Sequence, residues 1–198
     1  YIAASSDKAG NGGFVGGISS TLLAQLEYCY RGGVAYANKE KGTNVEISSQ
    51  YAESFSDAAK GKAIANSMYS DGCDIVFHAA GGVGTGVIEA AKDANKLAIG
   101  VDRDQSSLAP ENVLTSALKR VNVAIVEISK KILKDGQKGG TTTSLGATEG
   151  AVGIPEEHHL MAEETYKAAI DLLDKVKAGS VVPPSSKDEL EKFTKALN

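Results

Sequence analysis

The chain has 198 residues, of which 42% are hydrophobic and 23% charged; this composition excludes a disordered, collagen-like or coiled-coil protein. Its formal net charge is −4, which argues against a nucleic-acid partner, because such binders normally carry a basic excess. Glycine supplies 22 residues and tryptophan none, and this glycine share exceeds the usual value of about 7%. We therefore expect a globular fold with many tight turns.

Short apolar runs alternate with helical patterns along the first two thirds of the chain. Strands separated by helices in this rhythm predict right-handed βαβ units and a doubly wound parallel sheet, which places the chain in the α/β class. Apolar residues at helical spacing predict helices over 22–30, 56–72 and 86–95. The runs predicted as strands are 14–15, 45–47, 75–77, 97–101 and 113–114.

The last third of the chain has a different pattern. A long amphipathic helix is predicted to end near Gly136, and two short strands are predicted at 141–143 and 151–154. A further helix is predicted over 166–176, and the last one starts near Ser186. The apolar positions that define the long helix are Val121, Ile125, Ile128 and Ile132.

The segments that follow the predicted strands carry the polar residues of interest. Because the carboxyl ends of parallel strands meet at one edge of a sheet, ligands of open α/β folds bind there. This edge gathers glycines, one or two aromatic residues, two carboxylates and a Lys-Arg pair, which suits a small polar ligand with a flat part and hydroxyl groups. The segments are 16–20, 53–57, 78–86, 102–105 and 116–120.

A glycine-rich loop follows the third predicted strand. Gly82, Gly84 and Gly86 open the next helix, and Asp102 follows at the spacing of a ribose contact, as in a dinucleotide-binding unit. Val87 stands where that fingerprint requires its third glycine, so the glycines more plausibly allow close approach of the backbone to a ligand or a helix. An NAD(P)-binding enzyme domain stays open as an alternative interpretation.

The chain offers poor catalytic and metal-binding sets. It has no nucleophile–base pair, so we expect binding without catalysis and without a cofactor. His78 ends a strand, where a hydrogen-bonded packing role is favoured, and His159 with Glu163 is interpreted as a solvated helix start rather than a metal site. Cys29 and Cys73 are interpreted as buried thiols, although their pairing is left open.

The beginning of the chain suggests a piece of a longer protein. No apolar run approaches the roughly 18 residues that would indicate a membrane span. The chain starts without Met or a signal peptide, and residues 1–5 have the pattern of a helix end. We therefore expect a processed chain or a fragment.

Four stretches stand out, in order along almost the whole chain: Gly-Gly-Phe-Val-Gly-Gly-Ile at 12–18, Ser-Phe-Ser-Asp-Ala-Ala-Lys-Gly at 54–61, Ala-Ala-Gly-Gly-Val-Gly-Thr-Gly at 79–86 and Ile-Gly-Val-Asp-Arg-Asp-Gln at 99–105. Together they resemble the basic membrane protein family. Its members are substrate-binding lipoproteins of bacterial ABC transporters, similar to the purine-nucleoside receptors. The resemblance implies the type I periplasmic-binding-protein fold, in which three crossovers join two doubly wound α/β lobes.

The resemblance also implies a domain division. Family members are longer, so most of the first lobe, the signal sequence and the lipidated cysteine would lie outside this chain. Residues 11–118 and 150–198 would form the second lobe, while 1–10 and 119–149 would be hinge crossovers and a remnant of the first lobe. An apolar helix face in 119–149 would then be exposed, which marks an interface, and the isolated fragment is expected to form a homo-oligomer or to rearrange there.

The family binds its ligand in the cleft between the lobes, so the resemblance implies a purine nucleoside or a related small polar molecule. The base is held between two aromatic side chains, of which the second-lobe one corresponds to Phe77, with Phe55 as its rival. The ribose-binding aspartate corresponds to Asp102, whose carboxylate would accept hydrogen bonds from two vicinal hydroxyl groups.

Three further positions match the family's site. Lys119 corresponds to the lysine at the next crossover, and Gly81 and Gly82 correspond to the rim where backbone amides meet the ligand. The resemblance implies an ABC transporter permease as partner and a lipid anchor at the outer face of the cytoplasmic membrane, in the cell envelope. A ligand-sensing regulator or a surface antigen on the same fold is the remaining alternative.

Overall fold

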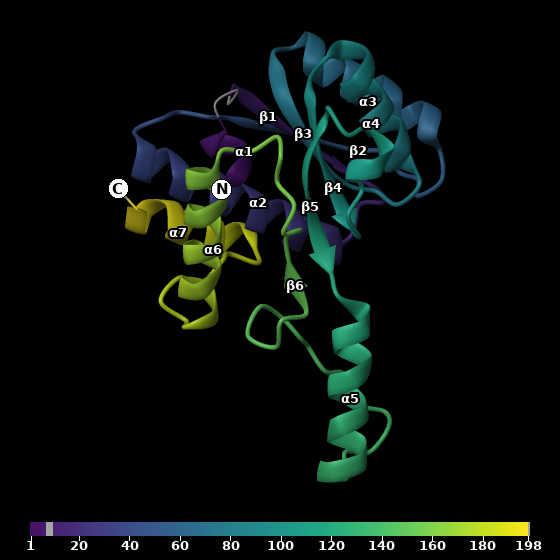
Figure 1. Ribbon diagram of the computed structural model, residues 1–198, viewed down its shortest axis with the longest axis vertical. Coiled ribbons are helices and arrows are strands. Elements are labelled where there is room, and N and C mark those ends of the chain that lie inside the picture. Colours follow the sequence, from purple (N-terminus) through teal and green to yellow (C-terminus); the bar gives the residue numbers. More distant parts are fainter. Residues whose placement is uncertain (7–9, 198) are drawn as a thin grey trace.

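The computed structural model describes residues 1–6 and 10–197, and it contains a six-stranded sheet flanked by helices (Figure 1). The strands lie in the order β2-β1-β3-β4-β5-β6, with β1 to β5 parallel and β6 antiparallel to β5. This arrangement confirms the α/β class and the doubly wound parallel sheet. In chain order the elements are α1 (Ile2–Ser5), β1 (Asn11–Gly16), α2 (Thr21–Lys41), β2 (Ile47–Tyr51), α3 (Ala58–Ser70), β3 (Cys73–Ala79), α4 (Val83–Ala94), β4 (Leu97–Asp102), the 3₁₀ helix η1 (Ser106–Leu108), β5 (Val113–Lys119), α5 (Val121–Asp135), β6 (Val152–Gly153), α6 (Glu163–Lys177) and α7 (Lys187–Leu197).

Two predicted strands differ from the structure. The second strand runs from Ile47 to Tyr51 instead of over 45–47, because the Asn38 side chain holds Val45: Asn38 Nδ2 donates to the Val45 carbonyl oxygen, and the Val45 amide donates to Asn38 Oδ1, each at 3.0 Å. The strand predicted at 141–143 is wrong, since this segment is irregular.

Two helix starts are also displaced. Helix α3, predicted from residue 56, begins at Ala58, because Asp57 caps it: the Asp57 carboxylate accepts the Lys60 amide hydrogen at 3.0 Å. The fourth helix begins at Val83, three residues before the predicted start at Gly86. Both shifts stay within the first turn of a helix, where boundaries are least fixed.

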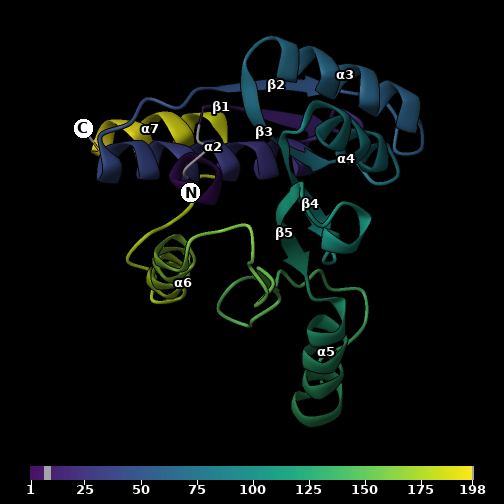
Figure 2. The ribbon, with the colours of Figure 1, turned by 45° about the horizontal axis from the view of Figure 1, so that its top comes forward.

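Alternate residues of each strand point to opposite faces of the sheet, so two apolar cores form. Val15 and Val76 pack on the face covered by α3 and α4. Phe14, Ile75 and Phe77 pack on the face covered by α2. Figure 2 shows α3 and α4 together on one side of the sheet, and α2 on the other with α7 lying along it.

Helices α3 and α4 approach each other closely through glycine. A Cβ at Gly86 would lie 1.8 Å from the Ala58 carbonyl oxygen, and a Cβ at Gly61 would lie 2.2 Å from the Val83 carbonyl oxygen. No side chain fits at either distance, so these glycines set the spacing of the two helices above the sheet.

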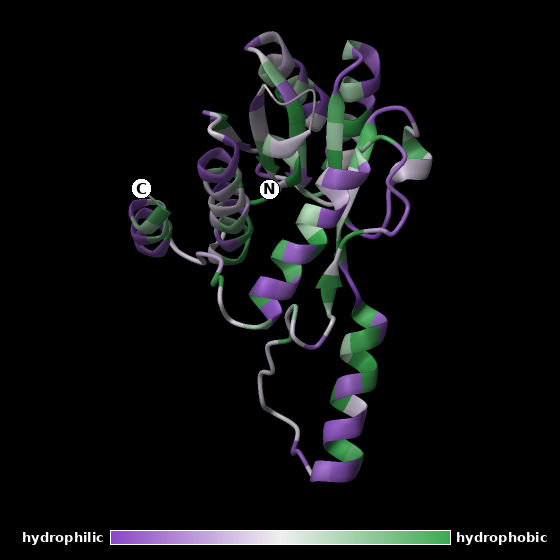
Figure 3. Ribbon diagram, turned by 60° about the vertical axis from the view of Figure 1, so that its left-hand side comes forward, coloured by the Kyte–Doolittle hydropathy of each residue, from purple (hydrophilic) through white to green (hydrophobic). Residues whose placement is uncertain are grey.

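Helix α5 projects away from the sheet (Figure 1). Several large hydrophobic side chains of α5 are at least half-exposed, and we call them the α5 apolar face. Leu133 is the most exposed of them, at 83%. Figure 3 shows apolar and polar residues alternating along this helix, and Gly136, in the left-handed conformation, ends it as predicted. The α5 apolar face consists of Val121, Ile125, Val126, Ile132 and Leu133.

The division into a lobe and crossovers stays a prediction, and residues 7–9 and 198 of its ranges lie outside the described residues. Beyond β5 the chain leaves the sheet as α5 and returns as β6, where Leu118 pairs with Gly153 and Lys119 with Val152. Within the described parts of the chain, no helix combines the length and the apolar character that a membrane crossing needs.

Replacing Gly86 by Ala tests the helix contact. The added methyl group has no room beside the Ala58 carbonyl oxygen, so α3 and α4 must move apart. We expect the free energy of unfolding, measured by urea denaturation, to fall by about 1–3 kcal/mol. The control is Gly139→Ala, at a position where a Cβ would meet nothing within 4 Å. Equal losses in both variants would contradict this explanation.

Candidate functional site

A cavity of about 820 Å³ opens beside the carboxyl ends of β3, β4 and β5. Its volume lies within the roughly 300–1,000 Å³ of typical small-molecule sites. The walls come from α1, α2, β3 to β6 and α6, and they are mostly apolar. Five of the six residues predicted for the site line this cavity: Phe55, Phe77, Gly81, Asp102 and Lys119.

The parallel sheet explains why these residues meet. Phe77 lies near the end of β3, Asp102 is the last residue of β4 and Lys119 the last of β5. Asp102 pairs in register with Leu118, which brings the two strand ends side by side. Phe77 and Lys119, which are 42 positions apart in the chain, therefore share one wall.

Among the described residues that line this cavity, Asp102 carries the only carboxylate. Its Oδ1 forms an ion pair with Lys119 Nζ at 2.7 Å, and the two side chains are 53% and 63% exposed. An exposed pair of this kind contributes at most about 1 kcal/mol to stability. A bound solute can therefore replace the lysine at small cost, and a carboxylate is a strong acceptor for hydroxyl groups.

The two candidate aromatic side chains differ in exposure. Phe77 is 6% exposed and packs edge-on against Phe14 and tilted against Tyr30, with ring centroids 5.6 and 5.2 Å apart. Phe55 is 47% exposed, and its ring lies over Gly17, where a Cβ would come within 2.2 Å of it. Phe77 thus forms part of the cavity floor, while Phe55 has a free surface for stacking.

The glycine loop at the start of α4 directs its amide groups to the protein itself. The Gly82 amide donates to the Phe55 carbonyl oxygen at 2.8 Å, and the Gly84 amide donates to the Gly81 carbonyl oxygen at 3.1 Å. Gly82 is the one predicted site residue outside the lining of the cavity. A pyrophosphate would need such amides unpaired, so the geometry does not support the dinucleotide alternative.

His78 has the packing role that its position predicted. Its ring is fully buried, and Nε2 lies 2.9 Å from Gln105 Oε1. Gly84 makes room for the ring, since a Cβ there would lie 2.0 Å from His78 Cε1. Burial lowers the pKa of His78 to about 4, although the hydrogen bond to Gln105 opposes this shift. The ring is therefore neutral near pH 7.

Sequence reasoning missed Gln105. Gln105 ends the Asp-Arg-Asp-Gln element after β4, and its place in this element is the one sequence feature that could have pointed to a role near the site. Its buried side chain contacts His78 of β3 and Val101 of β4, and no local sequence pattern reveals these contacts.

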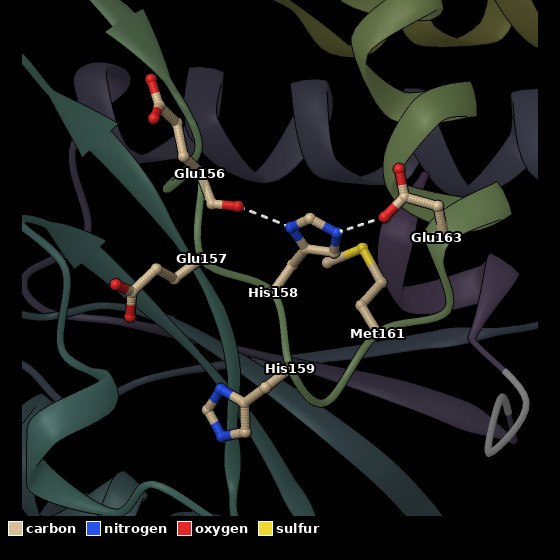
Figure 4. Close-up of a pocket in the computed structure, with 6 residues that line it drawn as sticks. All are labelled: Glu156, Glu157, His158, His159, Met161 and Glu163. Carbon is tan, nitrogen blue, oxygen red and sulfur yellow. Dashed lines mark hydrogen bonds and ion pairs between the residues drawn. The ribbon is translucent and has the colours of Figure 1, made fainter.

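A second hollow of about 470 Å³ lies before α6 (Figure 4). His158 stacks on Tyr166 with ring centroids 3.8 Å apart, and its Nε2 lies 2.9 Å from Glu163 Oε2. His159 points away and places Nε2 2.9 Å from the Pro110 carbonyl oxygen, so the pair of His159 and Glu163 considered for a metal does not form.

Metal-binding and disulfide chemistry find no support in the described residues. Among them, no group of three or more His, Cys, Asp or Glu side chains is arranged to hold a metal ion. Both cysteines are free thiols: Cys73 is buried, and Cys29 is half-buried with Sγ 3.2 Å from the Pro184 carbonyl oxygen. Burial raises the pKa of both thiols, so neither is activated as a nucleophile.

Solved structures share the fold of this chain. The chain superposes on an ABC transporter solute-binding protein from Aeropyrum pernix K1 with a TM-score of 0.79 and 24% identity, covering 100% of this chain and 65% of that one. A transcriptional activator of the comK gene from Bacillus halodurans gives a TM-score of 0.73 at 20% identity, covering 92% of this chain and 61% of that one. These likenesses show that the fold is that of periplasmic-binding-type solute receptors.

Sequence comparison narrows the class to a family. Residues 1–187 match the family described as ABC transporter substrate-binding protein PnrA-like, and the chain belongs to this family. It is 41% identical over 198 residues to basic membrane protein A of Borreliella afzelii, and 38% identical to basic membrane protein D of Borreliella burgdorferi strain JD1. Both matches cover 98% of this chain but only 60% and 57% of the relatives, so the chain spans about three fifths of their length. The family consists of substrate-binding proteins and not of enzymes.

The histidines provide a test of the site's electrostatics. His78, with its pKa near 4, stays neutral in the folded protein where the unfolded chain binds a proton. The free energy of unfolding therefore falls as pH drops from about 6.5 towards 4, by about 3 kcal/mol from this group. His158 acts with the opposite sign, since its hydrogen bond to Glu163 raises its pKa and stabilises the fold at low pH.

NMR titration of the ring protons measures both values directly. We expect His158 to titrate above the ordinary histidine range and His78 well below it. In His78→Gln, which keeps a donor towards Gln105, the loss of stability between pH 6.5 and 4 should be smaller. A His78 ring that titrates near 6.5 would contradict the buried neutral state.

Proposed function

We propose that this chain forms the second lobe of the solute-binding component of an ABC importer, and that its solute is a purine nucleoside or a closely related molecule. The observation that carries the proposal is the convergence of Asp102, Lys119, Phe55 and Gly81 on one cavity at the carboxyl edge of the sheet. These groups match the parts of a nucleoside: a carboxylate for ribose hydroxyls and an aromatic face for the base.

Asp102 is proposed to hold the sugar. Its carboxylate accepts hydrogen bonds from two vicinal hydroxyl groups once Lys119 swings away or joins them. Lys119 is the last residue of β5, directly before α5, so the ion pair joins the solute site to the point where the chain leaves the sheet.

Phe55 is proposed to stack on the base, and Phe77 to form the floor beneath it. This assignment reverses the order of preference that the family resemblance implies, because Phe55 is 47% exposed and Phe77 only 6%. The Phe55 loop is held in place by the hydrogen bond from the Gly82 amide at 2.8 Å. Gly82 therefore contributes by positioning the loop, and Gly81 lines the cavity.

The remaining part of the longer protein is proposed to cover the α5 apolar face. About two fifths of the relatives' length lies outside the part that this chain matches, which is enough for a second lobe. Closure of two lobes around a solute supplies contacts from both sides. The permease partner, the lipid anchor and the position outside the cytoplasmic membrane belong to this proposal for the whole protein.

Solute binding is tested by titrating the ¹⁵N-labelled chain with inosine and adenosine in NMR. One lobe supplies only part of the contacts, so binding in the millimolar range is expected. The amide signals of Gly81, Asp102 and Lys119 should shift together. Asp102→Ala should weaken binding by at least about tenfold, or about 1.4 kcal/mol, because the ribose hydroxyls lose a charged acceptor.

The matched control is Asp104→Asn, two residues along the same loop. Asp104 is exposed and accepts the Ser106 amide hydrogen, but it does not line the cavity. Binding should be unchanged in this variant. Absence of any shift at millimolar nucleoside, or equal losses in both variants, would reject the nucleoside proposal.

The α5 apolar face is tested by sedimentation of the chain alone. Without a cover, this face is expected to drive self-association. Leu133→Lys should restore a monomer, whereas Lys134→Gln, on the same helix, should leave the association unchanged. A monomeric wild-type chain with α5 ordered would contradict the assignment of this face as an interface.

A further inference from the structure

The backbone at Asp102 has an uncommon conformation. Its φ is 68°, in the left-handed region that residues other than glycine rarely adopt. The Arg103 amide donates to the Val101 carbonyl oxygen at 2.8 Å, which turns the chain sharply at this point. Such a conformation persists only where the surrounding structure fixes it.

The last residues of β4 are not paired with β3 in the sheet. The ladder between β3 and β4 ends with the pair of Phe77 and Ile99, two residues before Val101. The Val101 amide donates instead to the side chain of Gln105, with Oε1 at 2.8 Å. A carboxamide oxygen thus replaces a sheet hydrogen bond where the two strands part.

Gln105 joins three strands, two through its side chain and the third through its backbone amide. Gln105 Oε1 also contacts His78 Nε2 of β3 at 2.9 Å, and the Gln105 amide donates to Ser116 Oγ of β5 at 3.1 Å. His78 and Ser116 are fully buried, and Gln105 is nearly so. Because the Val101 amide can face only an acceptor, the carboxamide oxygen occupies this position, and His78 carries its hydrogen on Nε2.

Glycine makes this arrangement possible. A Cβ at Gly100 would lie 2.6 Å from both Gln105 Oε1 and Ser116 Oγ, and a Cβ at Gly84 would overlap the His78 ring. Both close approaches leave room for polar side chains below the strand ends. The backbone at Gly84 and Gly100 thus leaves room for the hydrogen-bond network of Gln105, His78 and Ser116 next to Asp102.

We infer that Gln105 is the positioning residue of the solute site: anchored to His78 and Ser116, it holds the Val101 amide with its side-chain oxygen and so fixes Asp102 in the left-handed conformation that turns its carboxylate to the cavity. Gln105 lies outside the cavity lining, so it acts through the backbone. The inference rests on the proposed function only in its effect on solute binding, since the effect on the Asp102 backbone is independent of any solute.

The test compares three variants of the chain by NMR. A left-handed residue gives a strong nuclear Overhauser effect between its own amide and Cα protons, so this signal reports the conformation of Asp102. Gln105→Met keeps the length of the side chain without an acceptor and should lose the strong signal. Gln105→Glu keeps an acceptor for the Val101 amide and should retain it.

The control is Asn112→Leu. The Asn112 side chain is buried and donates to the carbonyl oxygens of Lys96 and Ala91 at 2.9 and 3.3 Å, away from the site. The Asn112→Leu variant should lower the melting temperature as Gln105→Met does, yet leave the strong nuclear Overhauser effect of Asp102 unchanged. Inosine binding should weaken by at least about tenfold in Gln105→Met and stay near wild type in Asn112→Leu.

The outcomes separate the two proposals. If Gln105→Met keeps the Asp102 signal and the inosine response, the positioning role is wrong. If the wild-type chain shows no inosine response, the nucleoside proposal fails, while the Asp102 signal still decides the role of Gln105. Should Gln105→Met not fold, Ser116→Ala removes one support of Gln105 and should weaken the same signal; an unchanged signal there would overturn the inference.

Discussion

The parallel pairing of β1 to β5 is the constraint on which the site depends. It brings the carboxyl ends of all five strands to one edge, so that Asp102 of β4 and Lys119 of β5 stand within 2.7 Å of each other. An antiparallel sheet would place alternate strand ends on opposite edges and disperse these groups. The proposed solute site thus depends first on the topology of the sheet and then on its side chains.

The edge needs local support because the strands do not stay paired to their ends. Beyond Ile99, β4 separates from β3, and polar side chains take over from the ladder. Gln105, His78 and Ser116 form hydrogen bonds there in a buried setting, where each unsatisfied group would be costly. The small-residue contact between α3 and α4 fixes the layer behind this edge. Together these contacts hold the residues at the strand ends in place, as a preorganised binding site requires.

Much of this organisation is readable from the sequence, and the limits have physical causes. The apolar runs identify the parallel strands, and the strand-end rule directs attention to Asp102 and Lys119. The displaced start of β2 depends on the Asn38 side chain, whose partner Val45 lies seven residues along the chain, and no strand propensity encodes that contact. The burial of Phe77 follows from Phe14 and Tyr30 on other elements. The role of Gln105 requires three strands to be assembled first.

A crystal structure of the chain soaked with inosine tests the central claim most directly. The account predicts that the ribose hydroxyls lie within hydrogen-bond distance of the Asp102 carboxylate, with the base over the Phe55 ring and the direct pair of Asp102 and Lys119 opened or shared with the sugar. Inosine bound elsewhere, with that ion pair intact and Phe55 free, would contradict it.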